Sequence, residues 1–438
     1  MRSYPPTTAN EMKTIIRRHW RAGLAVIAGL LVVVVATVPW HGSTTLQPAA
    51  DGARPTASAT ASHPTTHAPT PNAKAAPAKK APAKAPASHA TTGVVKVDGP
   101  VSLRVPGQIH LPWPSMGQAG ITVSGVGAMG RSGSAKAVPT ASVAKAMTAY
   151  LILKDHPIKG NGPWLRVTPA EAAAFPTQVR MGQSLVPVRP NEVLSERQAL
   201  QALMLASADN MAQILARWDA GSVPAFVAKM NTAAKQLGMA STHYTDPSGY
   251  EKHTVSTVGD QMKLASAALR VPGFKQVTSQ KTAVIPVAGH IKNFNQLLNE
   301  PGVMGIKTGS MSAAGGCLAF AAQTKVAGRY VTILGTVLGQ RSNRIGDLRQ
   351  AFASSHNLLG AAKRSLTPVR IVHKGQVVSK VSGTARTLVA SNDVVIPGWA
   401  GMSVAGKVTA SVAPAAKSGA TVGTLTVGSY GKTAVAVH

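Results

Sequence analysis

The fold is decided by the stretch at positions 140–149, which reads TASVAKAMTA. Ser142 stands three residues before Lys145 at the start of a helical pattern that runs over 142–153. On a helix this spacing puts both side chains on one face, with the serine near the positive end of the helix dipole. A lysine that burial or a second cation keeps neutral can act as general base for a serine. The stretch therefore predicts a nucleophile at Ser142 that is activated by Lys145.

The serine-lysine spacing alone is weak evidence, because residues 429–432 repeat it near the C-terminus. Two further motifs strengthen the prediction. Ser207-Ala208-Asp209-Asn210 lies in a region of helical periodicity, and Lys307-Thr308-Gly309 shortly precedes an apolar strand at 318–323.

The order and spacing of these motifs resemble the low-molecular-weight penicillin-binding proteins, the D-alanyl-D-alanine carboxypeptidases of the serine peptidase S11 family. The resemblance extends over about residues 118–362 and includes HYTDPSG at 243–249 and VMGIKTGS at 303–310. It implies an α/β (α+β) domain like that of penicillin-binding proteins and serine β-lactamases, with helices flanking an antiparallel sheet. We expect this domain at 93–364 and a small β-rich domain at 365–438.

The resemblance also implies roles for the catalytic side chains. Ser142 would attack the carbonyl group between two D-alanines, Lys145 would take the serine proton, and Ser207 would relay a proton to the leaving amine. The implied substrate is the peptidoglycan stem pentapeptide, and β-lactams would be covalent inhibitors. No cofactor is implied.

The third motif would bind the substrate. Lys307 and Thr308 would hold its terminal carboxylate, which requires a cation and a hydroxyl group. Gly309 would let the strand backbone approach, so that the peptide lies beside the strand. The backbone N–H groups of Ser142 and Ser310 would form the oxyanion hole.

One departure from the family pattern concerns the second motif, which usually has asparagine in its third position. Here Asp209 stands in that place and Asn210 follows it; we expect both to contact the substrate or the catalytic lysine. An ionised carboxylate only accepts hydrogen bonds and would hold Lys145 charged. A weak enzyme or an inactive cell-wall binder of the same fold is therefore an alternative. A β-lactamase is another, although no Glu-x-x-Leu-Asn segment occurs between Asn210 and Lys307.

Composition narrows the classes of partner. Forty-five basic against 15 acidic residues give a net charge of +30, which attracts an anionic cell-wall polymer or a membrane surface. Aromatic residues are only 4% of the chain, so a stacking platform for nucleic acid is not expected. The single cysteine, Cys317, excludes an intramolecular disulfide and is expected in the core, and no zinc-type spacing occurs.

The N-terminal region predicts a membrane anchor. Residues 1–21 form a basic cytoplasmic segment, residues 22–40 a transmembrane helix, and residues 41–92 an extended linker rich in alanine, proline, threonine and lysine. A cleaved signal peptide is the alternative. The catalytic domain would lie on the extracytoplasmic side of the cell membrane, attached by a single pass.

Hydrophobic periodicity predicts the remaining elements. Strands are expected at 119–126, 318–323 and 330–338, the last two joined by a turn at 327–328. Helices are expected at 195–218, 223–237, 257–269 and 345–362, and apolar alternation continues at 369–372, 406–412 and 422–427.

Overall fold

The computed structural model describes residues 93–438, so the anchor expected at 22–40 and the linker expected at 41–92 lie outside the described residues. Within 93–438, no helix combines the length and the apolar character needed to cross a bilayer.

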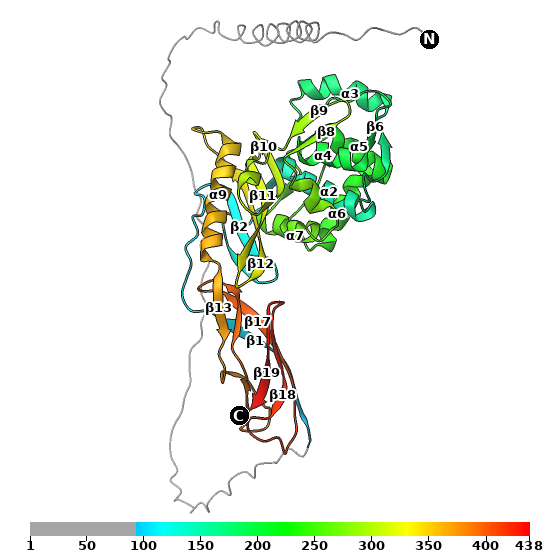
Figure 1. Cartoon of the computed structure of the whole chain (residues 1–438). Coiled ribbons are helices and arrows are strands. Elements are labelled where there is room, and N and C mark those ends of the chain that lie inside the picture. The colour runs from blue at the N-terminus through cyan, green and yellow to red at the C-terminus, as the bar shows by residue number, and fades with distance from the viewer. Residues whose placement is uncertain (1–92) are drawn as a thin grey trace, which may run out of the picture. The chain divides into compact units, whose positions relative to one another are not determined.

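A five-stranded antiparallel sheet supports the three motifs (Figure 1). The predicted strand pair is confirmed, and its turn places Ala327 and Gly328 at φ values of 50° and 79°, as a tight hairpin requires. In spatial order the strands are β10 (Val303–Met311), β11 (Gly315–Val326), β12 (Arg329–Gln340), β2 (Gln118–Val123) and β3 (Gly127–Ser132).

Both faces of this sheet are buried, as the continuous apolar run in β11 requires. Alternate residues point to opposite faces. Cys317, Ala319 and Ala321 pack with the helical part of the domain, whereas Leu318 and Phe320 pack toward α9 (Asp347–Ser365) on the other face (Figure 1). Cys317 is fully buried, which confirms the prediction that it is a core residue, and burial raises its pKa to about 12.

The helical part is organised around α2 (Lys145–Asp155), which follows the short 3₁₀ helix η1 (Ala141–Ala144). Residues 145–153 are all buried, so α2 is surrounded by protein and has no solvent-facing stripe over this length. The surrounding helices are α3 (Pro169–Arg180), α4 (Glu196–Met204), α5 (Asp209–Ala220), α6 (Val223–Gln236), α7 (Val258–Ala268) and α8 (Phe274–Thr278).

Three short strand pairs and a second 3₁₀ helix connect these helices. They are β4 (Val138–Pro139) with β7 (Val255–Ser256), β5 (Trp164–Arg166) with β6 (Val193–Ser195), β8 (Thr282–Ile285) with β9 (Gly289–Lys292), and η2 (Gln296–Asn299).

The single helix predicted at 195–218 is wrong, because the chain forms two helices with a break at residues 205–208. Ser207 adopts a left-handed φ of 59°, and Ala208 is extended. The apolar residues before and after the break are buried in one core cluster, so the periodicity continues across it. The break places the second motif at the start of α5, whereas the sequence suggested a helix interior.

The β-rich domain contains a six-stranded antiparallel sheet and one separate strand pair. The sheet order is β1 (Val95–Arg104), β17 (Ser403–Val412), β18 (Thr421–Val427), β19 (Gly431–Val437), β15 (Thr387–Ala390) and β14 (Val377–Lys380), and the separate pair is β13 (Thr367–Val372) with β16 (Val394–Gly398).

The expected domain boundary at residue 93 needs correction, because β1 belongs to the β-rich sheet. It pairs with β17 from Val95 opposite Val412 to Arg104 opposite Ser403. Both strands alternate in burial, so β17 gains on its outer edge a partner with the same inward and outward pattern. Residues 95–104 therefore pair with the C-terminal domain although they precede the catalytic domain in the chain.

The repeated serine-lysine spacing at 429–432 falls on the β18–β19 hairpin, which contacts the catalytic domain. The Tyr430 hydroxyl donates to the Ser124 carbonyl oxygen at 2.6 Å, and Arg329 donates to the Tyr430 carbonyl oxygen at 2.8 Å. In the structure this segment therefore contributes to the contact between the two sheets.

Candidate active site

Lys145 is the most highly connected polar group of the site. Its Nζ donates to Ser142 Oγ at 2.8 Å, to Asp209 Oδ1 at 2.5 Å and to the Ser248 carbonyl oxygen at 2.9 Å. The lysine is fully buried, whereas Ser142 is only half-buried. Three acceptors match the three hydrogens of an ammonium group, so this geometry is that of a charged lysine.

Asp209 uses both carboxylate oxygens in fixed contacts. Oδ1 accepts from Lys145, Oδ2 accepts from the Ser184 backbone N–H at 2.9 Å, and the Asp209 N–H donates to the Ser184 carbonyl oxygen at 2.6 Å. A carboxylate accepts at both ends, whereas an amide accepts only at its oxygen. Position 209 therefore suits aspartate because both of its side-chain neighbours are donors.

Asn210 points away from this centre, contrary to the expectation that it contacts substrate. Its Oδ1 accepts from the Val186 N–H at 3.3 Å, and its Nδ2 donates to the Val186 carbonyl oxygen at 2.8 Å. Asn210 is buried and its amide is occupied by one backbone segment. Asp209 and Asn210 have different partners because the side chains of adjacent residues on a helix point in different directions.

Ser248 was not singled out as a site residue from the sequence, although it belongs to the quoted HYTDPSG segment. Asp246 shapes this loop by accepting from the Ser248 N–H and hydroxyl and from the Thr254 hydroxyl. At Gly249, where φ is 77°, a Cβ atom would come within 1.9 Å of the Ala141 carbonyl oxygen. The loop can therefore approach η1 closely enough for the Ser248 carbonyl group to reach Lys145.

Lys307 and Ser207 form a second buried pair. Lys307 Nζ donates to Ser207 Oγ and to the Thr308 carbonyl oxygen, both at 3.0 Å. Burial, and secondly the charge of Lys145, hold the pKa of Lys307 well below its ordinary value, while Asp209 opposes this shift. Two acceptors are satisfied by the two hydrogens of a neutral amine. Because Ser207 accepts from Lys307, its own hydroxyl hydrogen stays available for another partner.

Strand β10 lies against the nucleophile and is an edge strand of the sheet. A Cβ atom at Gly309 would be 2.8 Å from the Ser142 backbone nitrogen and 3.1 Å from Ala141 Cβ. Glycine is therefore required for this approach. Ser310 follows as an exposed residue that lines the same cleft as Ser142, whose N–H lies at a helix start where no helical acceptor is available.

A cleft of about 480 Å³ opens at Ser142. Asp209 lies in its lining, while Lys145 and Lys307 are buried beyond it. Its walls are the loop around Met181–Ser184, the segment Tyr250–Lys252 and the end of β10 with the following turn, residues 310–313.

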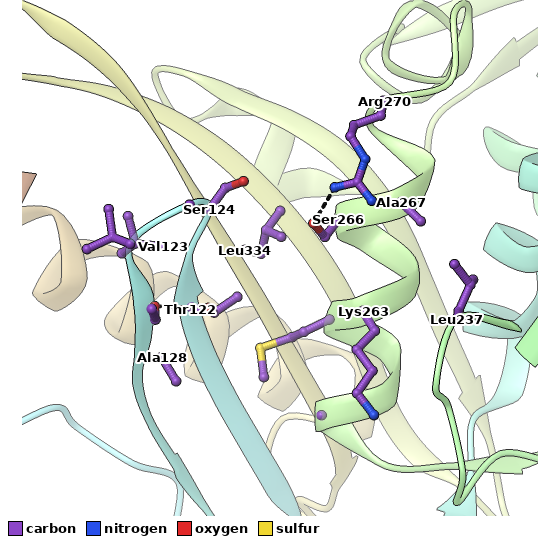
Figure 2. A pocket seen from close by; sticks show the side chains of 15 residues that line it. Thr122, Val123, Ser124, Ala128, Leu237, Lys263, Ser266, Ala267, Arg270 and Leu334 are labelled. Atoms are coloured by element: carbon purple, nitrogen blue, oxygen red, sulfur yellow. Dashed lines mark hydrogen bonds between the residues drawn. The ribbon is translucent and has the colours of Figure 1, made fainter. Parts of the chain in front are cut away.

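A second hollow of about 580 Å³ lies between the β2–β3 hairpin and α7 (Figure 2). Its rim carries Lys263 and Arg270, but Lys263 pairs with Asp260 and Arg270 donates to Ser266 at 3.1 Å. Strands β2 and β3 end the sheet opposite β10. This hollow therefore contains none of the residues of the three motifs.

Comparisons with known proteins agree with this geometry. A family model described as D-alanyl-D-alanine carboxypeptidase matches residues 131–339. The D-alanyl-D-alanine carboxypeptidase of Streptomyces sp. strain K15 is 33% identical over 220 residues, covering 46% of this chain and 73% of that protein. The D-alanyl-D-alanine endopeptidase of Pseudomonas aeruginosa is 31% identical over 189 residues, covering 41% of this chain and 58% of that protein.

A solved structure of a mutant of the Streptomyces K15 DD-transpeptidase matches with a TM-score of 0.50 and 27% identity, covering 57% of this chain and 98% of that chain. This likeness confirms the expected penicillin-binding-type fold. The match to the endopeptidase spans less than two thirds of that relative's own length.

Replacing Gly309 by alanine should slow the acylation of Ser142 by a fluorescent penicillin by about 100-fold or more, because the added methyl group pushes β10 away from the Ser142 N–H. Stopped-flow labelling measures this rate. Gly99→Ala is the matched control, since nothing lies within 4 Å of a Cβ there. Labelling of Gly309→Ala at the wild-type rate would show that the close contact between β10 and the Ser142 N–H does not affect acylation.

Binding of a peptide that ends in D-Ala-D-Ala should weaken as pH rises from acidic to alkaline values across the lowered pKa of Lys307. Lys307 is charged below its pKa and neutral above it, so its attraction for the carboxylate is lost at a lower pH than for an exposed lysine. Calorimetry with the Ser142→Ala variant measures the dissociation constant without turnover. The amidated peptide, which lacks the carboxylate, should show little change. Equal affinity for the free acid over the whole range contradicts this role of Lys307.

Proposed function

The chain belongs to the D-alanyl-D-alanine carboxypeptidase family, and on that basis we propose that it removes the terminal D-alanine of peptidoglycan stem peptides through an acyl-enzyme on Ser142. The observation that carries this proposal is the position of Ser142, which accepts from a buried lysine and faces a glycine of an edge strand. An extended peptide can pair with that edge and bring its carbonyl carbon to Ser142 Oγ.

Acylation requires Lys145 to lose a proton before it can accept the one from Ser142. Asp209 Oδ1, at 2.5 Å, is the nearest acceptor for that proton. Ser142 Oγ then bonds to the substrate carbonyl carbon while its own proton passes to Lys145. The N–H groups of Ser142 and Ser310 would stabilise the negative oxygen that develops.

Departure of the D-alanine requires a proton on its nitrogen, and the proton that Lys145 took from Ser142 is its source. Ser207 can relay that proton to the nitrogen, because its oxygen already accepts from Lys307 and its hydrogen is free to donate. Lys307, charged when the carboxylate is bound, and Thr308 would meanwhile hold the terminal carboxylate of the substrate. Water then hydrolyses the ester, which releases the shortened stem peptide and restores Ser142.

The same site would react covalently with β-lactams, which present a strained amide to the nucleophile. Some relatives are named endopeptidases, so cleavage of a cross-linked peptide is the neighbouring activity within the family. The alternatives from other classes are a weak or inactive cell-wall binder and a β-lactamase.

The proposed location is the extracytoplasmic face of a cell membrane. The apolar segment at 22–40 would anchor the chain, with basic residues 1–21 in the cytoplasm and the extended linker at 41–92 holding the enzyme outward. The net positive charge favours an anionic surface or polymer as a weak additional partner, because the chain has 45 basic and only 15 acidic residues.

The proposed activity is tested by incubating the purified full-length chain with a pentapeptide, a cross-linked dimer and a penicillin. Release of D-alanine from the pentapeptide should exceed both cleavage of the dimer and turnover of the penicillin. A fluorescent penicillin should label the chain covalently, and Ser142→Ala should abolish the label. Faster penicillin turnover identifies a β-lactamase, whereas the absence of both label and D-alanine identifies an inactive binder.

A further inference from the structure

Glu251 is a charged side chain of the cleft to which the proposed reaction assigns no role. It lines the cleft with its neighbour Lys252, and both are exposed. Neither side chain has a hydrogen-bond or ion-pair partner among residues 93–438. Every other exposed or half-buried side-chain carboxylate in that range accepts at least one hydrogen bond. An unpartnered carboxylate is notable in a chain with three times as many basic as acidic residues.

The backbone that carries Glu251 and Lys252 is held firmly. The Tyr250 hydroxyl donates to the Met181 carbonyl oxygen at 2.8 Å, which ties this segment to the opposite loop of the cleft. The Thr254 N–H donates to the Glu251 carbonyl oxygen at 3.0 Å, and the Tyr250 N–H donates to Asp246. The two charged side chains therefore project from a fixed support, which reduces the entropy lost when they bind a ligand.

The direction of β10 shows which part of a substrate would reach them. Lys307 and Thr308 lie on one side of Gly309 and would take the terminal carboxylate, so the acyl part of the peptide extends along residues 310–313. Residues 310–313 and residues 250–252 line the same cleft. The side chain that precedes the two D-alanines would therefore enter the region beside Glu251.

We infer that Glu251 and Lys252 recognise a zwitterionic end group on that side chain, with the ammonium group on Glu251 and the carboxylate on Lys252. This inference rests on the proposed function and refines its substrate class. Stem peptides carry a diamino acid at this position. A diaminopimelic acid residue offers both charges, lysine offers only the ammonium group, and a residue already used in a cross-link has lost its ammonium group. Glu251 and Lys252 would thus favour stem peptides that contain diaminopimelic acid and are not cross-linked.

The test uses three peptides that end in D-Ala-D-Ala and differ only in the preceding residue, which is diaminopimelic acid, lysine or Nε-acetyl-lysine. The rate of D-alanine release gives kcat/KM for the full-length chain, and calorimetry with Ser142→Ala gives the dissociation constants. Wild type should rank them in that order. Glu251→Gln should lower kcat/KM about five-fold for the first two peptides and leave the acetylated one unchanged.

Two further variants make the test specific. Lys252→Gln should lower kcat/KM for the diaminopimelic peptide alone. Glu251→Asp keeps the negative charge and should retain part of the peptide preference that Glu251→Gln loses. Asp98→Asn is the matched control, because it makes the same charge change on β1, where Asp98 pairs with Lys407; all three peptides should be unaffected.

The inference is overturned if Glu251→Gln lowers kcat/KM for all three peptides equally, which indicates a structural effect, or for none of them. Failure of the proposed function looks different, since wild type would then release D-alanine from no peptide. In that case the dissociation constants of Ser142→Ala still decide the inference. Equal affinity for the three peptides contradicts it, and the ranked order supports it.

Discussion

A buried ammonium group must be surrounded by acceptors, and the site is built around this requirement at Lys145. Its three partners come from distant parts of the chain, namely the turn before α2, the start of α5 and the loop at residues 246–254. The cost of burying an unpaired charge would be several kcal/mol, so each segment is needed in its observed place. The nucleophile is positioned as one of these three acceptors.

The close approach of these segments is achieved through unusual backbone conformations. Ala141 and Ser207 have φ values of 46° and 59°, which are rare for residues that carry a Cβ atom. Gly249 and Gly309 approach η1 at distances that no side chain would allow. Such strain is concentrated where the surrounding contacts enforce it. The same contacts that hold Lys145 therefore also hold Ser142 against β10 and Ser207 against Lys307.

Local patterns were sufficient to predict the central strand pair, helices α6, α7 and α9, and the buried Cys317. They failed where tertiary contacts decide the outcome. The apolar periodicity continued across the break at Ser207 because α4 and α5 bury residues in one cluster. No local feature of residues 95–104 shows that β1 pairs with a strand some 300 residues later. Likewise, the sequence could not divide the roles of Asp209 and Asn210, since only the position of the helix start turns one toward Lys145 and the other toward Val186.

Acylation depends on Asp209, the carboxylate that holds Lys145 against Ser142 and is the nearest acceptor for the lysine proton. The most direct measurement is the rate of acylation by a penicillin, in wild type and in Asp209→Asn. The amide keeps the shape of the side chain but accepts only at its oxygen, so it cannot serve Lys145 and the Ser184 N–H together or take the lysine proton. The rate should therefore fall by about 100-fold. Acylation of Asp209→Asn at the wild-type rate would contradict this role of Asp209.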